Sequence, residues 1–346
     1  MKTVLVVGGN GFLGSYICQD LLNSGYFVVS LDNFSKYGYL ERDFKNHPNF
    51  KLVEGNAINL SIWNEIYWRN WVQRADYIIN CAAVIGGIEL FHKRPYDILS
   101  VNERINASVL DCAIDLHKNY NLKRIISISS SMVFENAKKF PSLEQDVSEI
   151  APPNSSYGFQ KLATEYMTKA AYIQYKLPYT IIRPFNCVGI GEDDFIKGEK
   201  SHVLPDLIMK CLQGQNPLKI FGSGNQIRCF THGKDIARGV RLAMESDKAL
   251  NEDFNISIQK ATPILQLAEM VWNKVNSGKP FVYECEKPFK HDIQKRIPDV
   301  SKAKDLLGFE AKISLEETVD EVIKYIKEKL EINNDINKTL EVVEPQ

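Results

Sequence analysis

The chain has 346 residues, of which 44% are hydrophobic and 25% charged, and these values predict a folded protein with a large core. The formal net charge of −1 argues against a broad nucleic-acid-binding surface, so no nucleic-acid partner is expected. No apolar run reaches the roughly 20 residues that span a bilayer, and Lys2 leads directly into the first predicted strand. We therefore expect neither a signal peptide nor a membrane partner. The seven cysteines form no CxxC pair, which favours a reduced, cytoplasmic protein without a metal site.

The N-terminal motif TVLVVGGNGFLG predicts a buried strand, a glycine-rich turn and a helix. Gly8 would allow the tight turn, Gly11 would let the backbone approach a diphosphate, and Gly14 would let helix and strand pack closely. Phe12 and Leu13 would lie at the helix N-terminus, where free N–H groups and the positive dipole end bind an anion. This pattern is typical of a dinucleotide site; an ordinary glycine-rich loop is the alternative.

A second predicted strand, Tyr26 to Leu31, leads to Asp32, which lies about 20 residues beyond the glycine turn. An acid at this position accepts a hydrogen bond from the adenosine ribose 2′-OH, and Asn33 follows it. No arginine adjoins Asp32 to bind a 2′-phosphate, so the cofactor predicted is NAD rather than NADP. A turn-forming Asp-Asn pair is the alternative interpretation.

Further strands are predicted at 50–54, 76–81, 124–129 and 179–184, and helices at 62–72, 95–120 and up to residue 175. This alternation predicts an α/β fold, a Rossmann domain over residues 1–185 with a doubly wound parallel sheet. Glycine-rich loops and short segments between 186 and 330 favour a smaller α+β substrate lobe. The polar stretch 331–346 predicts a frayed tail.

Tyr157 and Lys161, in YGFQK, lie four residues apart on a predicted helix and so share one face. A nearby ammonium and the positive nicotinamide ring favour a phenolate, and a useful lowering of the phenol pKa requires about 3–4 kcal/mol. Tyr157 could then take the proton of a hydroxyl while the hydride of the same carbon passes to NAD. A chance spacing on a helix is the alternative.

Together, GGNGFLG, Asp32, NCAA, SSSMVF, YGFQK and RPFN resemble the extended short-chain dehydrogenase/reductase family of nucleotide-sugar epimerases, dehydratases and reductases. The resemblance implies that Tyr157 is the catalytic acid or base and that Lys161 orients the ribose. It implies that Ser130, with Ser131 as its rival, bonds the reacting hydroxyl. It also implies cofactor contacts from Asn56, Ala57, Ala82, Ala83 and Asn102.

The segments GSGNQIRCFTHGKD and RIPDVSKAKDLLGF resemble those whose arginines bind a sugar-nucleotide diphosphate, which implies that role for Arg228 and Arg296. A surface salt bridge is the alternative for each arginine. Asn186 in RPFN is implied to contact the phosphate or the sugar. Ser131, Met132, His202 and Val203 complete the expected substrate contacts.

The dehydratases of this family carry an Asp-Glu pair where the chain has Ser131 and Met132, so elimination of water is not expected. DDFIKGEKSHVLPDL and AAVIGGI look like the branch of GDP-fucose synthase and GDP-mannose 3,5-epimerase. In that branch the histidine that matches His202 works with a cysteine, whose position Met132 occupies. Because a thioether cannot exchange a proton, half of that pair is missing, and His202 is either an acid or a residue that lines the substrate.

Hydride transfer alone is the chemistry that remains. We expect oxidation of a ring hydroxyl, at C4, of a GDP-linked sugar by a 4-dehydrogenase or a 4-epimerase. The alternatives are an NADPH-dependent keto-sugar reductase and 3,5-epimerase like GDP-fucose synthase, and a non-catalytic NAD-binding regulatory module. The resemblance also implies a homodimer through helices at 102–120 and 157–175, with Cys112, Ala113 and Leu116 either in that interface or in the core.

Overall fold

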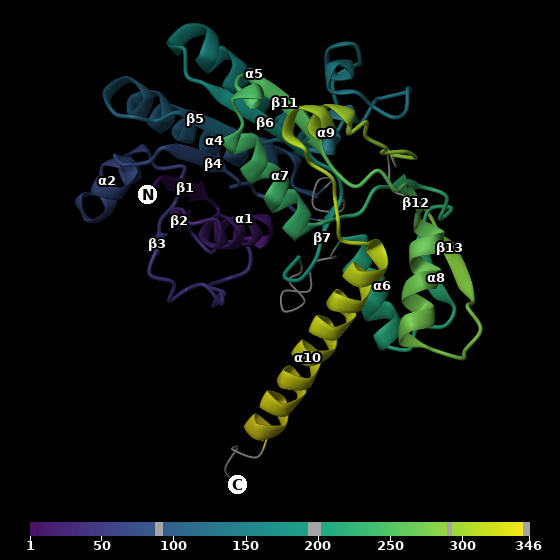
Figure 1. Cartoon of the computed structure of the whole chain (residues 1–346). Coiled ribbons are helices and arrows are strands. Elements are labelled where there is room, and N and C mark those ends of the chain that lie inside the picture. The colour runs from purple at the N-terminus through teal and green to yellow at the C-terminus, as the bar shows by residue number, and fades with distance from the viewer. Residues whose placement is uncertain (87–92, 193–201, 289–292, 342–346) are drawn as a thin grey trace.

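The computed structural model of the protein describes residues 1–86, 93–192, 202–288 and 293–341 (Figure 1). A seven-stranded sheet forms its centre, with the order β11-β6-β5-β4-β1-β2-β3, and all neighbouring strands run parallel. The chain runs outward from β1 to β3, then returns to the other side of β1 and continues to β11. This reversal lies between β1 and β4, and an open α/β sheet binds its ligand at such a point. The strands are β1 (Thr3–Val7), β2 (Phe27–Asp32), β3 (Phe50–Glu54), β4 (Tyr77–Asn80), β5 (Arg124–Ile128), β6 (Tyr179–Pro184) and β11 (Glu252–Ile256).

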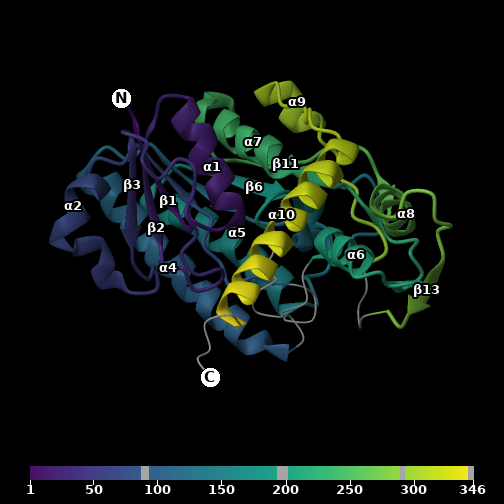
Figure 2. The same cartoon turned by 90° about the horizontal axis from the view of Figure 1, so that it is seen from below.

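Helices cover both faces of this sheet, as the predicted doubly wound fold requires. Alternate residues of β1 face opposite sides: Val4 and Val6 pack in one core, and Leu5 and Val7 pack in the other. Figure 2 shows α1 and α7 on one side of the strands and α2 and α4 on the other. The helices of these layers are α1 (Phe12–Asn23), α7 (Gly233–Glu245) and α9 (Ser301–Leu307), and α2 (Ile66–Val72), α4 (Pro95–Asn119) and α5 (Ser156–Tyr175).

A separate hydrophobic core joins α6, β8, α8 and the first turns of α10 on the right of Figure 1. Three two-stranded sheets accompany it: β7 with β10, β9 with β12, and β8 with β13. The elements are β7 (Cys187–Val188), α6 (Val203–Leu212), β8 (Leu218–Phe221), β9 (Ile227–Arg228), β10 (Thr231–His232), β12 (Thr262–Pro263), α8 (Ile264–Val275), β13 (Tyr283–Glu286) and α10 (Leu315–Glu341). Short 3-10 helices are η1 (Leu60–Asn64), η2 (Ser131–Phe134), η3 (Glu144–Ser148) and η4 (Asp247–Ala249).

Two expectations for the C-terminal half need correction. The stretch 186–330 is not one contiguous lobe, because α7 packs on α1 and β11 pairs with β6 in the large sheet. The polar segment after residue 330 is not frayed as far as Glu341, because α10 continues through it. The first turns of α10 bury one apolar face in the core: Leu315, Val319, Val322 and Ile326. Because these packed turns nucleate the helix, the polar residues that follow can continue it. Residues 342–346 of the predicted tail lie outside the described residues.

The predicted helix at 62–72 is also interrupted. It is divided at Glu65 into η1 and α2. By contrast, α4 begins at the predicted Pro95, and α5 begins after Ser155, whose Oγ accepts a hydrogen bond from the Gly158 backbone N–H. Within the described ranges, no helix combines the length and the apolar character needed to cross a membrane.

Candidate active site

The glycine-rich turn between β1 and α1 forms one wall of the site. Gly8 has a φ of +80°, a conformation that favours glycine. A Cβ on Gly14 would lie 2.0 Å from the Gly8 carbonyl oxygen, so only glycine allows the helix to pack this closely on the strand. No side chain caps the N-terminus of α1 at Gly11. Its first N–H groups, at Phe12 and Leu13, are therefore suited to bind a diphosphate.

The carboxylate of Asp32 lies at the end of β2, at the rim of the same wall. Its Oδ2 accepts a hydrogen bond from the Asn10 backbone N–H (2.9 Å), and its Oδ1 accepts one from the Phe34 N–H (2.8 Å). These bonds fix the carboxylate, and each oxygen keeps capacity for a ribose hydroxyl. Asn56 Oδ1 accepts from the Ile58 backbone N–H (3.1 Å), and a carbonyl oxygen can accept a second bond, here from an adenine amino group. The donor and acceptor set of this wall fits the adenosine diphosphate of NAD.

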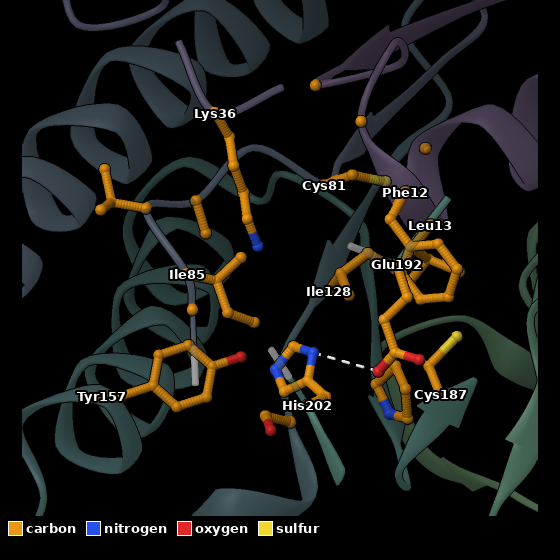
Figure 3. A pocket seen from close by; sticks show the side chains of 18 of the residues that line it. Phe12, Leu13, Lys36, Cys81, Ile85, Ile128, Tyr157, Cys187, Glu192 and His202 are labelled. Atoms are coloured by element: carbon orange, nitrogen blue, oxygen red, sulfur yellow. Dashed lines mark ion pairs between the residues drawn. The ribbon is translucent and has the colours of Figure 1, made fainter. Parts of the chain in front are cut away.

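A cavity of about 630 Å³ connects this wall with the C-terminal ends of the other strands. Figure 3 shows Tyr157, His202 and Glu192 among the side chains around it. All predicted site residues except Asn102 line the cavity: Gly8, Gly11, Phe12, Leu13, Gly14, Asp32, Asn33, Asn56, Ala57, Ala82, Ala83, Ser130, Ser131, Met132, Tyr157, Lys161, Asn186, His202, Val203, Arg228 and Arg296.

Asn102 was expected to contact the cofactor, but its side-chain amide bonds to the backbone of Val84 instead. Its Oδ1 accepts a hydrogen bond from the Val84 N–H (2.6 Å), and its Nδ2 donates to the Val84 carbonyl (3.0 Å). Both ends of the buried amide thus hold the backbone that follows Ala82 and Ala83. Asn102 positions a wall of the cavity and does not line it.

Tyr157, Lys161 and Ser130 converge at the bottom of the cavity. Lys161 Nζ lies 5.9 Å from the centroid of the Tyr157 ring and donates to the Ile128 carbonyl oxygen (2.8 Å) at the end of β5. Ser130 follows that strand, and its Oγ accepts a hydrogen bond from the Met132 N–H (3.2 Å) at the start of η2. The chain therefore brings a phenol, an ammonium and a hydroxyl together, as the motifs predict.

Burial controls the ionisation of this group. It raises the pKa of Tyr157 to about 12, against the opposing effects of a hydrogen bond from Ser130 and of the nearby Arg296 cation. Burial also lowers the pKa of Lys161 to about 8, although Cys81, Glu103 and Glu165 act to raise it. The predicted lowering of the Tyr157 pKa relied on two cations, Lys161 and the nicotinamide ring; in the polypeptide alone, burial keeps this pKa above its ordinary value. A lower phenol pKa requires an additional positive charge in the cavity.

The two arginines of the C-terminal half reach the cavity from two adjacent segments of the chain. Arg228, in β9, donates from Nη2 to the Ile293 carbonyl (2.7 Å). Arg296 is held through its backbone N–H, which donates to the Ile227 carbonyl (3.0 Å). Its guanidinium Nη1 lies 3.4 Å from Ser131 Oγ and 3.3 Å from Met132 Sδ. Arg296, expected on a diphosphate, thus lies next to the residues that follow Ser130.

The comparison with protein families decides the wider identity of this site. The model of the NAD dependent epimerase/dehydratase family matches residues 4–257. The chain belongs to this family. The protein is therefore an NAD-dependent enzyme, and the glycine turn, Asp32, Tyr157 and Lys161 all lie within the matched part.

Individual relatives cover nearly the whole chain. UDP-N-acetyl-alpha-D-glucosaminuronate decarboxylase of Bacillus cytotoxicus is 28% identical, over 96% of this chain and 99% of its own. The structure of UDP-glucose 4-epimerase from Thermotoga maritima with UDP-glucose is 29% identical, with a TM-score of 0.81, and covers 95% of this chain and 99% of its own. UDP-glucuronic acid 4-epimerase from Bacillus cereus, in complex with UDP-glucuronic acid and NAD, is 27% identical, with a TM-score of 0.79, over 94% and 99%. None of these three comes from the GDP-sugar branch that the sequence suggested.

Glu192 also lines the cavity, and the sequence motifs did not predict a role for it. Its Oε1 lies 3.0 Å from His202 Nδ1, as the dashed line in Figure 3 marks. The only signal in the sequence was an acid after the glycine-rich run that follows RPFN. Residues 87–92 and 193–201 lie outside the described residues. They carry parts of the AAVIGGI and DDFIKGEKSHVLPDL motifs.

Proposed function

We propose that the protein is a 4-epimerase of a UDP-linked sugar that carries a carboxylate at C6. The observation that supports this best is the contact of Arg296 with Ser131 and Met132, directly beside Ser130. A guanidinium near the reacting hydroxyl matches a planar carboxylate on the same sugar ring. Arg228 remains the expected ligand of the diphosphate. The three relatives reported above are named for UDP-sugars, and UDP therefore replaces the GDP of our sequence-based hypothesis.

The residues at the bottom of the cavity have separate roles in this reaction. Tyr157 takes the proton of the C4 hydroxyl, and Ser130 holds the oxygen by a hydrogen bond. Lys161 holds the cofactor ribose and supplies positive charge beside the phenol. NAD, when bound, accepts a hydride from a carbinol carbon and can return it to the ketone. Ser131 and Met132 provide no further acid or base, which agrees with a reaction that needs hydride transfer alone.

Decarboxylation is the second candidate, because one of the relatives reported above is named as a uronate decarboxylase. A 4-ketone with a carboxylate on C6 is a β-keto acid, and such an acid loses CO₂ when it stays in the site long enough. Oxidation at C4, loss of C6 as CO₂ and return of the hydride to the ketone then give a pentose product. The two reactions differ in whether the 4-ketone is reduced with C6 retained or only after C6 has left as CO₂.

NMR analysis of the purified protein with NAD and UDP-glucuronate tests the proposal. We expect UDP-galacturonate as the product, whereas UDP-xylose or a free 4-keto sugar would show the decarboxylase or the dehydrogenase. UDP-glucose and GDP-mannose serve as matched substrates without the carboxylate. Turnover of GDP-mannose alone would contradict the UDP-uronate assignment and restore the GDP hypothesis.

The variant Arg296→Met tests the role of the guanidinium separately. Loss of one charge-assisted hydrogen-bonded pair, about 1.5–3 kcal/mol, should lower kcat/KM for UDP-glucuronate by about 10- to 100-fold. Turnover of UDP-glucose should change much less, so the preference for the uronate should disappear. An equal loss for both sugars would instead support a phosphate-binding role for Arg296.

We also propose that the protein forms a homodimer through α4 and α5. Three large apolar side chains spaced seven residues apart on α5 are exposed: Phe159 (45%), Tyr166 (70%) and Ile173 (71%). Cys112, Ala113 and Leu116 of α4 are buried in the protein's own core instead. Sedimentation of the protein and of Tyr166→Lys tests this interface, since a new lysine should shift the variant to the monomer.

A further inference from the structure

A contact between a carboxylate and an imidazole inside the cavity has no role in the proposed reaction. The side chain of Glu192 is only 3% exposed, and that of His202, which precedes α6, is 37% exposed. Glu192 Oε1 lies 3.0 Å from His202 Nδ1. Figure 3 shows that the imidazole and the phenol of Tyr157 point into the same cavity. The pair therefore faces the same cavity as the proposed catalytic phenol.

The backbone around Glu192 is held in place by two tyrosines. Tyr37 Oη donates a hydrogen bond to the Glu192 carbonyl oxygen (3.2 Å), and Tyr16 Oη donates to the Ile190 carbonyl oxygen (3.2 Å). Tyr16 belongs to α1, so this segment is fixed to the helix that begins at the glycine turn. A carboxylate held in this way can fix the orientation of the imidazole that it contacts.

The chemistry of the two groups defines what they can bind. A carboxylate only accepts hydrogen bonds, so the neutral His202 ring carries its proton on Nδ1, toward Glu192. Nε2 is then an acceptor. Among the described residues, Glu192 Oε2 is buried without a hydrogen-bond partner, so it can still accept a hydrogen bond from a ligand. Acceptors of this kind suit a sugar hydroxyl and do not suit a phosphate or a carboxylate.

We propose that Glu192 is a positioning residue that holds His202 as the acceptor of a substrate hydroxyl, and that the pair selects sugars with a free C3 hydroxyl. This assignment rests on the proposed function, in which C4 is oxidised. C4 has two ring neighbours, C5, which bears the carboxylate assigned to Arg296, and C3, which bears a hydroxyl. The hydroxyl at C3 is therefore the donor next to the reacting carbon that still lacks a partner in the proposed site.

The test compares UDP-glucuronate with its 3-deoxy analogue in binding by calorimetry and in kcat/KM. For the wild type we expect the affinity and the kcat/KM of the analogue to be about five- to tenfold lower than those of UDP-glucuronate, as the loss of one hydrogen bond predicts. In the variant His202→Leu, the affinities and the kcat/KM values of the two ligands should differ by less than twofold. Glu192→Leu should lose the discrimination in the same way, because His202 is then no longer oriented. Glu192→Gln should keep most of it, because the amide oxygen can still accept from Nδ1.

General damage to the fold would weaken the binding of both ligands alike and leave the ratio of their affinities unchanged. This ratio therefore reports on the contact between Glu192 and His202. The proposal is overturned if the wild type does not distinguish the two ligands, or if His202→Leu keeps the ratio. Loss of discrimination in His202→Leu but not in Glu192→Leu overturns the positioning role. Absence of C4 chemistry with discrimination in binding would overturn the proposed reaction and leave this inference standing.

Discussion

The buried ammonium of Lys161 should make the protein less stable than it would be without this charge. Burial lowers the pKa of Lys161 from 10.5 to about 8, and at about 1.4 kcal/mol per pKa unit this costs about 3 kcal/mol below pH 8. Lys161→Met removes that penalty but leaves the Ile128 carbonyl without its donor, which costs about 1–3 kcal/mol. We therefore expect a variant without activity that is, at pH 7, at least as stable as the wild type.

The pH dependence gives the sharper measurement. Between pH 8 and 10.5 the unfolded chain holds the Lys161 proton and the folded protein releases it, so the stability of the wild type rises with pH relative to Lys161→Met. We compare the free energies of unfolding of both proteins in urea at pH 7, 8, 9 and 10. The value of the wild type should rise relative to that of the variant by about 2–3 kcal/mol between pH 7 and 10. Lys169→Met, at an exposed position of the same helix, is the control and should give a constant difference. A constant difference for Lys161→Met would refute the reasoning.

Three further substitutions test other parts of the site. Tyr157→Phe should lower kcat by at least about 100-fold and leave NAD binding intact, and near-normal turnover in the NMR assay would exclude Tyr157 as the proton carrier. Gly14→Ala puts a Cβ 2.0 Å from the Gly8 carbonyl, so the purified variant should contain little NAD and melt at a lower temperature; normal cofactor content would contradict the role of this close packing. Asp32→Ala removes the acceptor for the adenosine ribose, so fluorescence titration should show NAD binding about tenfold weaker and NADP binding little changed, whereas equal losses would argue against the NAD preference.

Much of the nucleotide half could be predicted because its signals are local. The turn at Gly8 and Gly14 depends on a backbone conformation and on one close approach, and both are encoded within a dozen residues. The limits of α5 follow from the cap at Ser155 and from the left-handed Lys176 at its other end. The contacts that these features need are made by residues close by in the sequence, so motif spacing was sufficient.

The return of the chain to the large sheet could not be predicted in the same way. β11 is a five-residue strand, and its pairing with β6 joins Glu252 to Thr180, residues far apart in the sequence. Nothing in the short segment EDFNI specifies that partner, because pairing is decided by the whole packed layer. The contact between Glu192 and His202 is hidden for the same reason, since ten positions of chain separate two residues that meet in space.

The ionisation of the site shows most clearly where reasoning from neighbours fails. The spacing of Tyr157 and Lys161 correctly predicted that they lie together, but a charge close by is only one influence on a pKa, and burial acts against both charged forms. Burial raises the pKa of the phenol to about 12 and lowers that of the ammonium to about 8, so both changes favour the neutral side chains. A cationic ligand in the cavity would favour the phenolate, and the phenolate would in turn stabilise the ammonium. Below pH 8 the ammonium of Lys161 is already charged, so the positive charge of a bound cofactor would act mainly on Tyr157 and shift it toward the phenolate.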